Sequence, residues 1–249
     1  QLLLASHMGL VLLFAVLLLA TGIGTIRSAV TAQARTEAER VGTDARRQLQ
    51  AWNRELSVGA DLLAQQPTLR FYLQRRQLTK ARTLVRNFHK TSDIEYVRVQ
   101  LGGKTIAEFG VAPPSFNMGL AFDPRGVAWR VLHREVRSLP QASIVIAEKL
   151  GDRLDVRPTT SLINAELLPI PEPATGKEDA WTRVLRQVAS TGEPVTVGAI
   201  GEVAAARIVR IRDEAGGANA LLSATVDQEW VERRIVEWFA AFGLSGLVT

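Results

Sequence analysis

The sequence predicts an α+β protein in which one long helix leaves a membrane and supports an antiparallel sheet. Three observations predict this class. Residues 2–26 form an apolar segment without a charged side chain, a helical pattern continues to residue 66, and alternating segments joined by short turns follow from residue 94. Helices segregated to one side of such strands favour α+β over a doubly wound parallel sheet. The 249 residues suffice for one large domain or two small ones.

Residues 1–26 are predicted to be a first transmembrane helix. The uncharged run of about 25 residues exceeds the roughly 20 that a helix needs to cross the hydrocarbon layer. The alternative is a cleavable signal peptide, but its apolar core would be shorter, about 7–15 residues. Arg27 closes the run, and helical sequence continues after it. We therefore expect a retained membrane anchor.

Residues 237–249 are predicted to begin a second transmembrane helix. This stretch, with Trp238 at its start, is apolar and follows Arg233, Arg234 and Glu237. A buried C-terminal helix is the alternative. Two membrane helices would place everything between them on one side of the membrane. We expect the bacterial inner membrane, with the main domain in the periplasm and the lipid bilayer as a partner.

Residues 27–66 are predicted to be a stalk helix. Small and apolar residues recur in steps of 4, 4 and 3, an 11-residue repeat that keeps one stripe nearly straight along the helix. Two uses fit this stripe: packing on a sheet, or contact with its copy in a dimer. The narrow first half favours a dimer stalk formed by Val30, Ala34, Ala38, Val41 and Ala45. The later Trp52, Leu56 and Leu63 are bulkier and are predicted to be core.

The next segments are a helix and a hairpin. Residues 68–90 are predicted to be a second helix, and its basic face is typical of a solvated surface. Residues 94–101 alternate, Gly102-Gly103 turns the chain, and residues 104–109 return. Residues 111–124 are predicted to be a loop. Residues 127–136 and 143–149 are predicted to pair as strands, with the turn at Leu139-Pro140; a helix is the alternative for residues 127–136.

The second half is mixed. We predict a short strand at residues 153–157, a short helix or turn at 160–168, and an amphipathic helix at 178–190. The last predicted elements are three strands and an exit helix that runs towards the membrane, at residues 195–200, 203–211, 218–226 and 228–237.

This order resembles the extracytoplasmic sensor regions of bacterial receptors, the Cache or PAS-like family. The resemblance rests on the stalk helix, the hairpin IEYVRVQLGGKTIAEFG and the closing ANALLSATVDQEWVERR. It implies one sensor domain over residues 67–236, with a five-stranded antiparallel sheet packed on the long helix and a ligand pocket on the opposite face. It also implies a dimer. The stretch of residues 111–192 is longer than a single sensor module needs. It is expected to be either a second module or an elaborated insert.

Composition excludes several kinds of chemistry. With no cysteine, the chain has no disulfide, thiolate zinc site or catalytic thiol. His7, His89 and His133 are isolated, and the sequence has no nucleophile elbow and no convincingly spaced Ser/His/Asp set. It therefore predicts no catalytic residues, metal ligands or cofactor in this segment, and an extracytoplasmic domain has no access to nucleic acid.

A small polar or anionic ligand is suggested by the arginines, because guanidinium groups pair well with carboxylates. Arg98, Arg130 and Arg207 lie on predicted strands and could point inward, and Trp129 lies beside Arg130. The alternative is that these arginines face solvent. The best hypothesis is a dimeric receptor of the two-component sensor histidine kinase type, whose catalytic part lies outside this segment. The alternatives are an accessory subunit of a membrane complex and a membrane-anchored enzyme.

Overall fold

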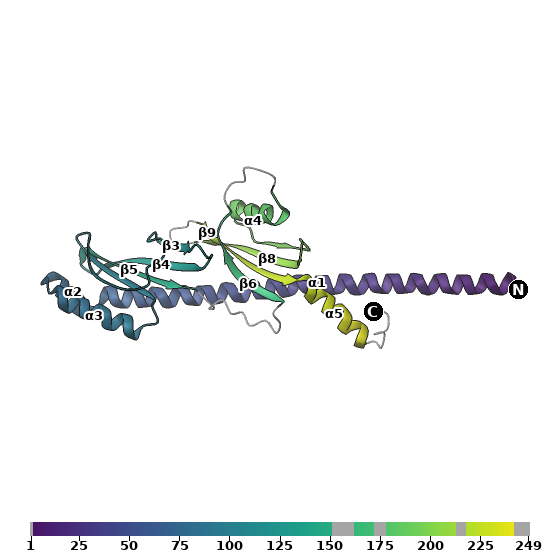
Figure 1. The fold of residues 1–249 in the computed structure, drawn as a ribbon, viewed down its shortest axis with the longest axis horizontal. Helices are drawn as coiled ribbons and strands as arrows, with labels where there is room; N and C mark the ends of the chain where they lie inside the picture. Colours follow the sequence, from purple (N-terminus) through teal and green to yellow (C-terminus); the bar gives the residue numbers. More distant parts are fainter. Residues whose placement is uncertain (1, 151–161, 172–177, 213–217, 242–249) are drawn as a thin grey trace.

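Two antiparallel sheets lie one after the other along a single helix, α1 (Leu2–Gln65), in the computed structural model (Figure 1). The structure describes residues 2–150, 162–171, 178–212 and 218–241. The α+β class, the long N-terminal helix and the antiparallel pairing are confirmed. The predicted strand at 153–157 lies outside the described residues.

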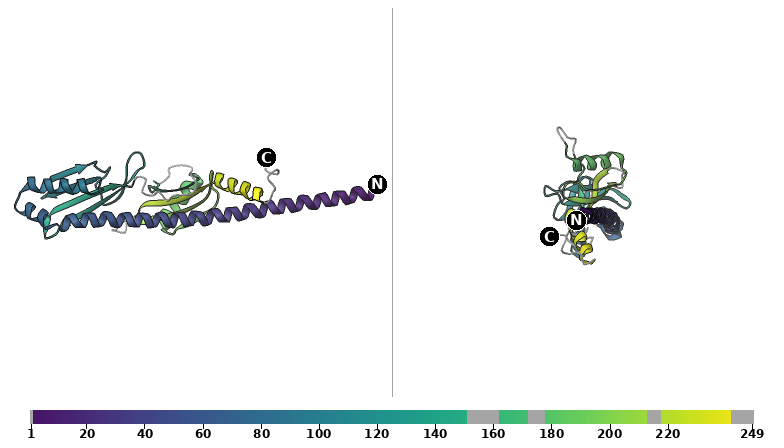
Figure 2. Two further views of the ribbon diagram at one scale, coloured as in Figure 1. Left: turned by 90° about the horizontal axis from the view of Figure 1, so that it is seen from below. Right: turned by 90° about the vertical axis from the view of Figure 1, so that its right-hand side faces the viewer.

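The N-terminal part of α1 extends beyond both sheets (Figures 1 and 2). Large apolar side chains are 58–70% exposed there: Leu10, Val11, Leu13, Phe14, Val16 and Leu17. Within the described residues, no helix has the length and apolarity needed to cross a membrane.

The first sheet has five strands in the order β2-β1-β5-β4-β3. Its strands are β1 (Tyr96–Leu101), β2 (Lys104–Gly110), β3 (Gly119–Phe122), β4 (Ala128–Val136) and β5 (Leu139–Lys149). The predicted hairpin is confirmed. Gly102 and Gly103 adopt φ values of 56° and 76°, which a two-residue turn of the mirror-image type requires and which glycine adopts without strain. The predicted loop at 111–124 contains β3, which the sequence did not indicate.

One face of the five-stranded sheet packs on the second half of α1 and on two short helices, α2 (Pro67–Gln74) and α3 (Leu78–Thr91). Leu56 and Leu63 of α1 belong to this core, as predicted. The single helix predicted at 68–90 is wrong, because the chain breaks at Arg76, whose φ of 53° is incompatible with a continuous right-handed helix.

The second sheet has four strands in the order β6-β9-β8-β7. Its strands are β6 (Ile163–Leu168), β7 (Val195–Val197), β8 (Val203–Arg212) and β9 (Ala218–Asp227). The helix or turn predicted at 160–168 is wrong: β6 pairs with β9 along its whole length, so tertiary pairing overrides a weak local preference. Helix α4 (Ala180–Thr191) covers the outer face of this sheet with Leu185 and Val188.

The small-residue stripe of α1 is used inside its own chain. Four of its members pack with Ala205, Ala224 and Val226 of the four-stranded sheet, and the fifth joins the core beside Trp52. All five are at most 1% exposed: Val30, Ala34, Ala38, Val41 and Ala45. The stripe therefore packs on a sheet of its own chain. Its side chains are buried there and are not accessible to the partner helix of a dimer.

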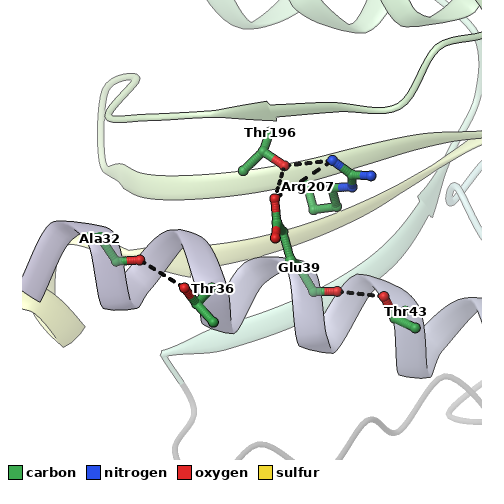
Figure 3. A network of polar contacts seen from close by, with 6 residues as sticks. All are labelled: Ala32, Thr36, Glu39, Thr43, Thr196 and Arg207. Carbon is green, nitrogen blue, oxygen red and sulfur yellow. Dashed lines mark hydrogen bonds and ion pairs between the residues drawn. The ribbon is translucent and has the colours of Figure 1, made fainter.

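Each sheet is also attached to α1 by an arginine. In the four-stranded sheet, Thr196 donates a hydrogen bond to Glu39 of α1 (2.8 Å) and accepts one from Arg207 (2.7 Å) (Figure 3). In the five-stranded sheet, Arg134 donates to both Asp61 and Ser57 of α1, each at 2.8 Å. A movement of either sheet along α1 would break these contacts.

Helix α5 (Gln228–Ala241) follows β9 and returns beside α1 (Figure 2). Trp230 and Val231 share a core with Val30 of α1. The exit helix predicted from residue 228 is therefore present. Residues 242–249, which include most of the second predicted membrane segment, lie outside the described residues.

The turn predicted at Leu139-Pro140 is displaced. Strand β4 ends at Val136, and Ser138 takes the left-handed conformation with a φ of 60°. Pro140 instead is the second residue of β5, where the strand is exposed and a proline is tolerated. Proline and glycine are common turn residues, but in this turn the left-handed position is occupied by a serine, which the sequence pattern did not indicate.

Candidate ligand-binding site

The outer face of the five-stranded sheet carries a cluster of polar and aromatic side chains. Tyr96 and Arg98 of β1 lie on this face because side chains two residues apart in a strand share a face. The hairpin register places Glu108 of β2 opposite Arg98. The Tyr96 hydroxyl and the Arg98 Nη2 donate hydrogen bonds to the same carboxylate oxygen of Glu108, at 2.6 and 2.9 Å. Adjacent strands thus pre-organise the three groups.

The segment between β2 and β3, residues 111–118, lies over this cluster. It leaves β2 at Gly110, where a Cβ would lie 1.8 Å from the Glu95 carbonyl oxygen, so only glycine fits. The Phe116 ring lies 3.9 Å from the Arg98 Cζ, a close cation–π contact, and its centroid is 5.7 Å from that of Tyr96. Phe116 therefore covers the guanidinium face that a ligand would use.

His133 of β4 holds this covering segment. Its Nε2 lies 2.7 Å from the Phe116 carbonyl oxygen, which can only accept, so Nε2 carries the donated hydrogen. Below the segment, an apolar patch shared by three strands comprises Tyr96, Trp129, Val131, Val145 and Ala147. The site therefore combines an apolar floor, a cation, a carboxylate and a hydroxyl, the mixture typical of small-molecule pockets.

The charge states in the cluster follow from its contacts. Burial raises the pKa of the Tyr96 hydroxyl, and the hydrogen bond that it donates to Glu108 raises that pKa further. The hydrogen bonds from Tyr96 and Arg98 lower the pKa of the Glu108 carboxyl. At neutral pH, Tyr96 is thus protonated and Glu108 ionised. A ligand anion approaching Arg98 would compete with both Glu108 and the Phe116 ring.

The four residues predicted to bind a ligand do not converge. Arg98 and Trp129 lie on the outer face of the same sheet. Arg130 lies on the opposite face, buried and directly across from Glu148 of β5. Arg207 belongs to the four-stranded sheet and contacts α1. Only the first two share a face, and the register places Trp129 of β4 four residues from His133, the β4 residue that is level with Arg98.

Sequence reasoning missed four members of the cluster. Tyr96 and Glu108 could have been predicted from the sequence, because strand alternation and the two-residue turn fix their face and register relative to Arg98. His133 was treated only as an isolated histidine without a metal-ligating neighbour, so its structural contact with residues 111–118 was not expected. No sequence pattern indicated the position of Phe116, because tertiary contacts determine the path of an irregular segment.

Comparisons with known proteins give structural similarity only. No protein-family model matches the chain, and no curated protein matches its sequence. Among solved structures, the chain is similar to the periplasmic domain of Vibrio cholerae LuxQ, with a TM-score of 0.48, 9% identity, and coverage of 77% of this chain and all of that one. It is also similar to the ligand-binding domain of the Pseudomonas aeruginosa amino acid chemoreceptor PctB in complex with L-Arg, with a TM-score of 0.46, 11% identity, and coverage of 83% and 93%.

Proposed function

We propose that the chain is the ligand-sensing region of a dimeric bacterial membrane receptor, of the sensor histidine kinase type, with its sheets in the periplasm. The observation that carries this proposal is the continuity of α1. One unbroken helix contacts the five-stranded sheet, the four-stranded sheet and α5. A change at the outer face of the first sheet can therefore be passed along one rigid element to the end where α5 returns.

Membrane anchoring is supported by the apolar start of α1. Side chains such as Leu13 and Phe14 are exposed around this part of the helix, which is costly in water and favourable in lipid. In this proposal residues 1–26 and 237–249 belong to the two membrane helices. Residues 27–236 lie between them on one side of the inner membrane.

Ligand binding would occur at the cluster around Arg98. The ligand we propose is small and polar or anionic, displacing Phe116 from the guanidinium and competing with Glu108. Displacement of Phe116 would release residues 111–118 from β4. The sheet could then adjust its contact with α1 through Arg134 and Asp61.

The test is a thermal-shift screen of the 249-residue chain in detergent with small carboxylates and amino acids. Compounds that raise the melting temperature are titrated again with Arg98→Gln and with the control Arg125→Gln, which removes the same charge from an exposed position in the β3–β4 turn. We expect Arg98→Gln to weaken binding by about tenfold or more and Arg125→Gln to leave it unchanged. If no stabilising compound loses affinity in Arg98→Gln, the assignment of this site is overturned.

Dimerisation would use a face of α1 other than the small-residue stripe. Val58 and Leu62, one turn apart, are 58% and 66% exposed on the half of α1 beside the five-stranded sheet. A second copy could cover them. Sedimentation velocity of the chain and of Leu62→Glu tests this: we expect a dimer and a monomer, respectively. A dimer that is equally stable in both would place the interface elsewhere.

A further inference from the structure

A second pocket lies in the other half of the molecule, between α1, the edge of β8 and the connection from α4 to β7. Its volume is about 420 Å³, within the range of small-molecule sites. Strand β7 pairs with β8 only up to Ile208, so the edge of β8 beyond that residue is open on this side. Buried Leu49, Val209 and Ile211 line part of the pocket.

Three arginines line this pocket: Arg46 from α1, and Arg210 and Arg212 from β8. The two strand arginines lie on one face, and a terminal nitrogen of each is within 3.4 Å of the position that a Cβ would take on Gly192. The two cations are therefore close neighbours. No Asp or Glu is among the described residues that line the pocket.

Among the residues that the structure describes, these three charges have no carboxylate partner. None of the three arginines forms an ion pair within the described ranges of the chain, whereas Arg98, Arg134, Arg186 and Arg207 all do. In addition, Arg210 Nε and Asn53 Oδ1 are buried and have no hydrogen-bond partner in the part of the chain that the structure describes. Arg46 and Arg212 are exposed and can be solvated, but Arg210 is half-buried, and a polar ligand in the pocket would supply partners for the buried Arg210 Nε and Asn53 Oδ1.

One structural role can explain part of this. Gly192 ends α4 in the left-handed conformation, and the carbonyl end of a helix carries about half a negative charge. Arg210 and Arg212 stabilise that end. Half a charge does not match three cations, and Arg46 reaches the pocket from a different element, α1. The described lining therefore has an excess of positive charge that could attract an anion.

We propose that this pocket binds a small organic anion carrying two or more carboxylate or phosphate groups. Guanidinium groups from two walls would pair with separate anionic groups, and the apolar side chains would contact the carbon skeleton. Because the pocket lies between α1 and β8, an occupant would contact both and stabilise the packing of the four-stranded sheet on α1. This site is independent of the cluster around Arg98 and shares no residue with it.

The test is calorimetric titration of the 249-residue chain with citrate as the carboxylate probe and pyrophosphate as the phosphate probe. We expect saturable binding of at least one probe, with a Kd of about 1 mM or tighter. The probe that binds with the lower Kd identifies whether the pocket prefers carboxylate or phosphate groups. Failure of both to bind at low and at moderate salt would overturn the proposal.

Two variants place the binding in this pocket. Arg210→Gln removes one cation and is expected to weaken binding by about tenfold. Gln50→Glu keeps every arginine and adds a carboxylate on the exposed surface of α1 that lines the pocket, so it should compete with the probe without harming the fold. Gln74→Glu in α2 makes the same charge change far away and should alter the Kd by less than about twofold. Equal weakening by both glutamates would indicate a general charge effect and contradict the proposal.

Discussion

The two sheets use α1 in the same way but differ on their outer faces. Each packs one face on α1 and is attached to it by an arginine, Arg134 or Arg207. The outer face of the four-stranded sheet is sealed by the amphipathic helix α4, whose Val188 is fully buried against Ile208. The outer face of the five-stranded sheet is covered by an irregular segment, held through Phe116 and polar contacts.

This difference between the two outer faces indicates which of them can respond to a ligand. A helix docked by apolar packing must lose much buried surface before it moves, whereas a segment held by one ring and a few hydrogen bonds can leave at modest cost. The five-stranded sheet is thus suited to sensing. The four-stranded sheet is suited to holding α1 and α5 in register close to the apolar end of α1.

The largest expected effect comes from disrupting the packing of α4 on the outer face of the four-stranded sheet. Ile208→Ala removes a fully buried side chain between the sheet and α4, and it should lower the free energy of unfolding by about 2–5 kcal/mol. Urea denaturation monitored by circular dichroism measures this. A loss below about 1 kcal/mol would mean that α4 is not firmly docked and that the contrast between the two faces is wrong.

A smaller effect tests how the four-stranded sheet is attached to α1. Thr196→Val removes the hydroxyl that joins Glu39 to Arg207 while keeping the shape of the side chain (Figure 3). We expect a loss of about 1 kcal/mol in the free energy of unfolding, measured by the same denaturation. The control is Thr36→Val, which removes a hydroxyl that bonds only within the exposed surface of α1. Equal losses in the two variants would show that the contact between sheet and helix contributes nothing of its own.

The smallest effect concerns pH at the sensing face. The pKa of Glu108 is lowered below the ordinary value of 4.5 by hydrogen bonds from Tyr96 and Arg98. The ionised carboxylate therefore stabilises the fold above about pH 4.5, and this contribution is lost as the pH falls through the lowered folded-state pKa. Because the Glu108 side chain is 41% exposed, we expect at most about 1 kcal/mol.

Glu108→Gln removes that titration. Its free energy of unfolding, measured from pH 7 to pH 3, should fall less steeply below pH 4.5 than that of the unchanged chain. Parallel curves for the two proteins would contradict the hydrogen-bonded arrangement of Tyr96, Arg98 and Glu108.

Much of the fold follows from local sequence. The 11-residue spacing predicts the buried side of α1, and Gly102-Gly103 predicts the hairpin, because both are encoded by neighbours along the chain. Strand β6 was missed because its apolar spacing does not exclude a helix, and only pairing with β9, far along the chain, decides the matter. The break at Arg76 was missed for a similar reason, since no glycine or proline marks it.

The site was harder to predict than the fold. Composition pointed to arginines but could not say which face of which sheet each occupies. Arg98 lies on β1 and Arg130 on β4, with β5 between them, and their side chains lie on opposite faces of the sheet, because successive residues of a strand alternate between its two faces. The role of Phe116 depends on an irregular segment, whose path no periodicity specifies.

The most direct test of the sensing face uses two variants with opposite expected effects on the same contact. Phe116→Ala uncovers the Arg98 guanidinium and Arg98→Gln removes it, so with a carboxylate found by thermal shift we expect tighter binding in the first and loss of binding in the second. Titration calorimetry on both, with Gln50→Glu as the control for the second pocket, measures each Kd. Binding that neither Phe116→Ala nor Arg98→Gln changes would contradict a ligand site on the outer face of the five-stranded sheet.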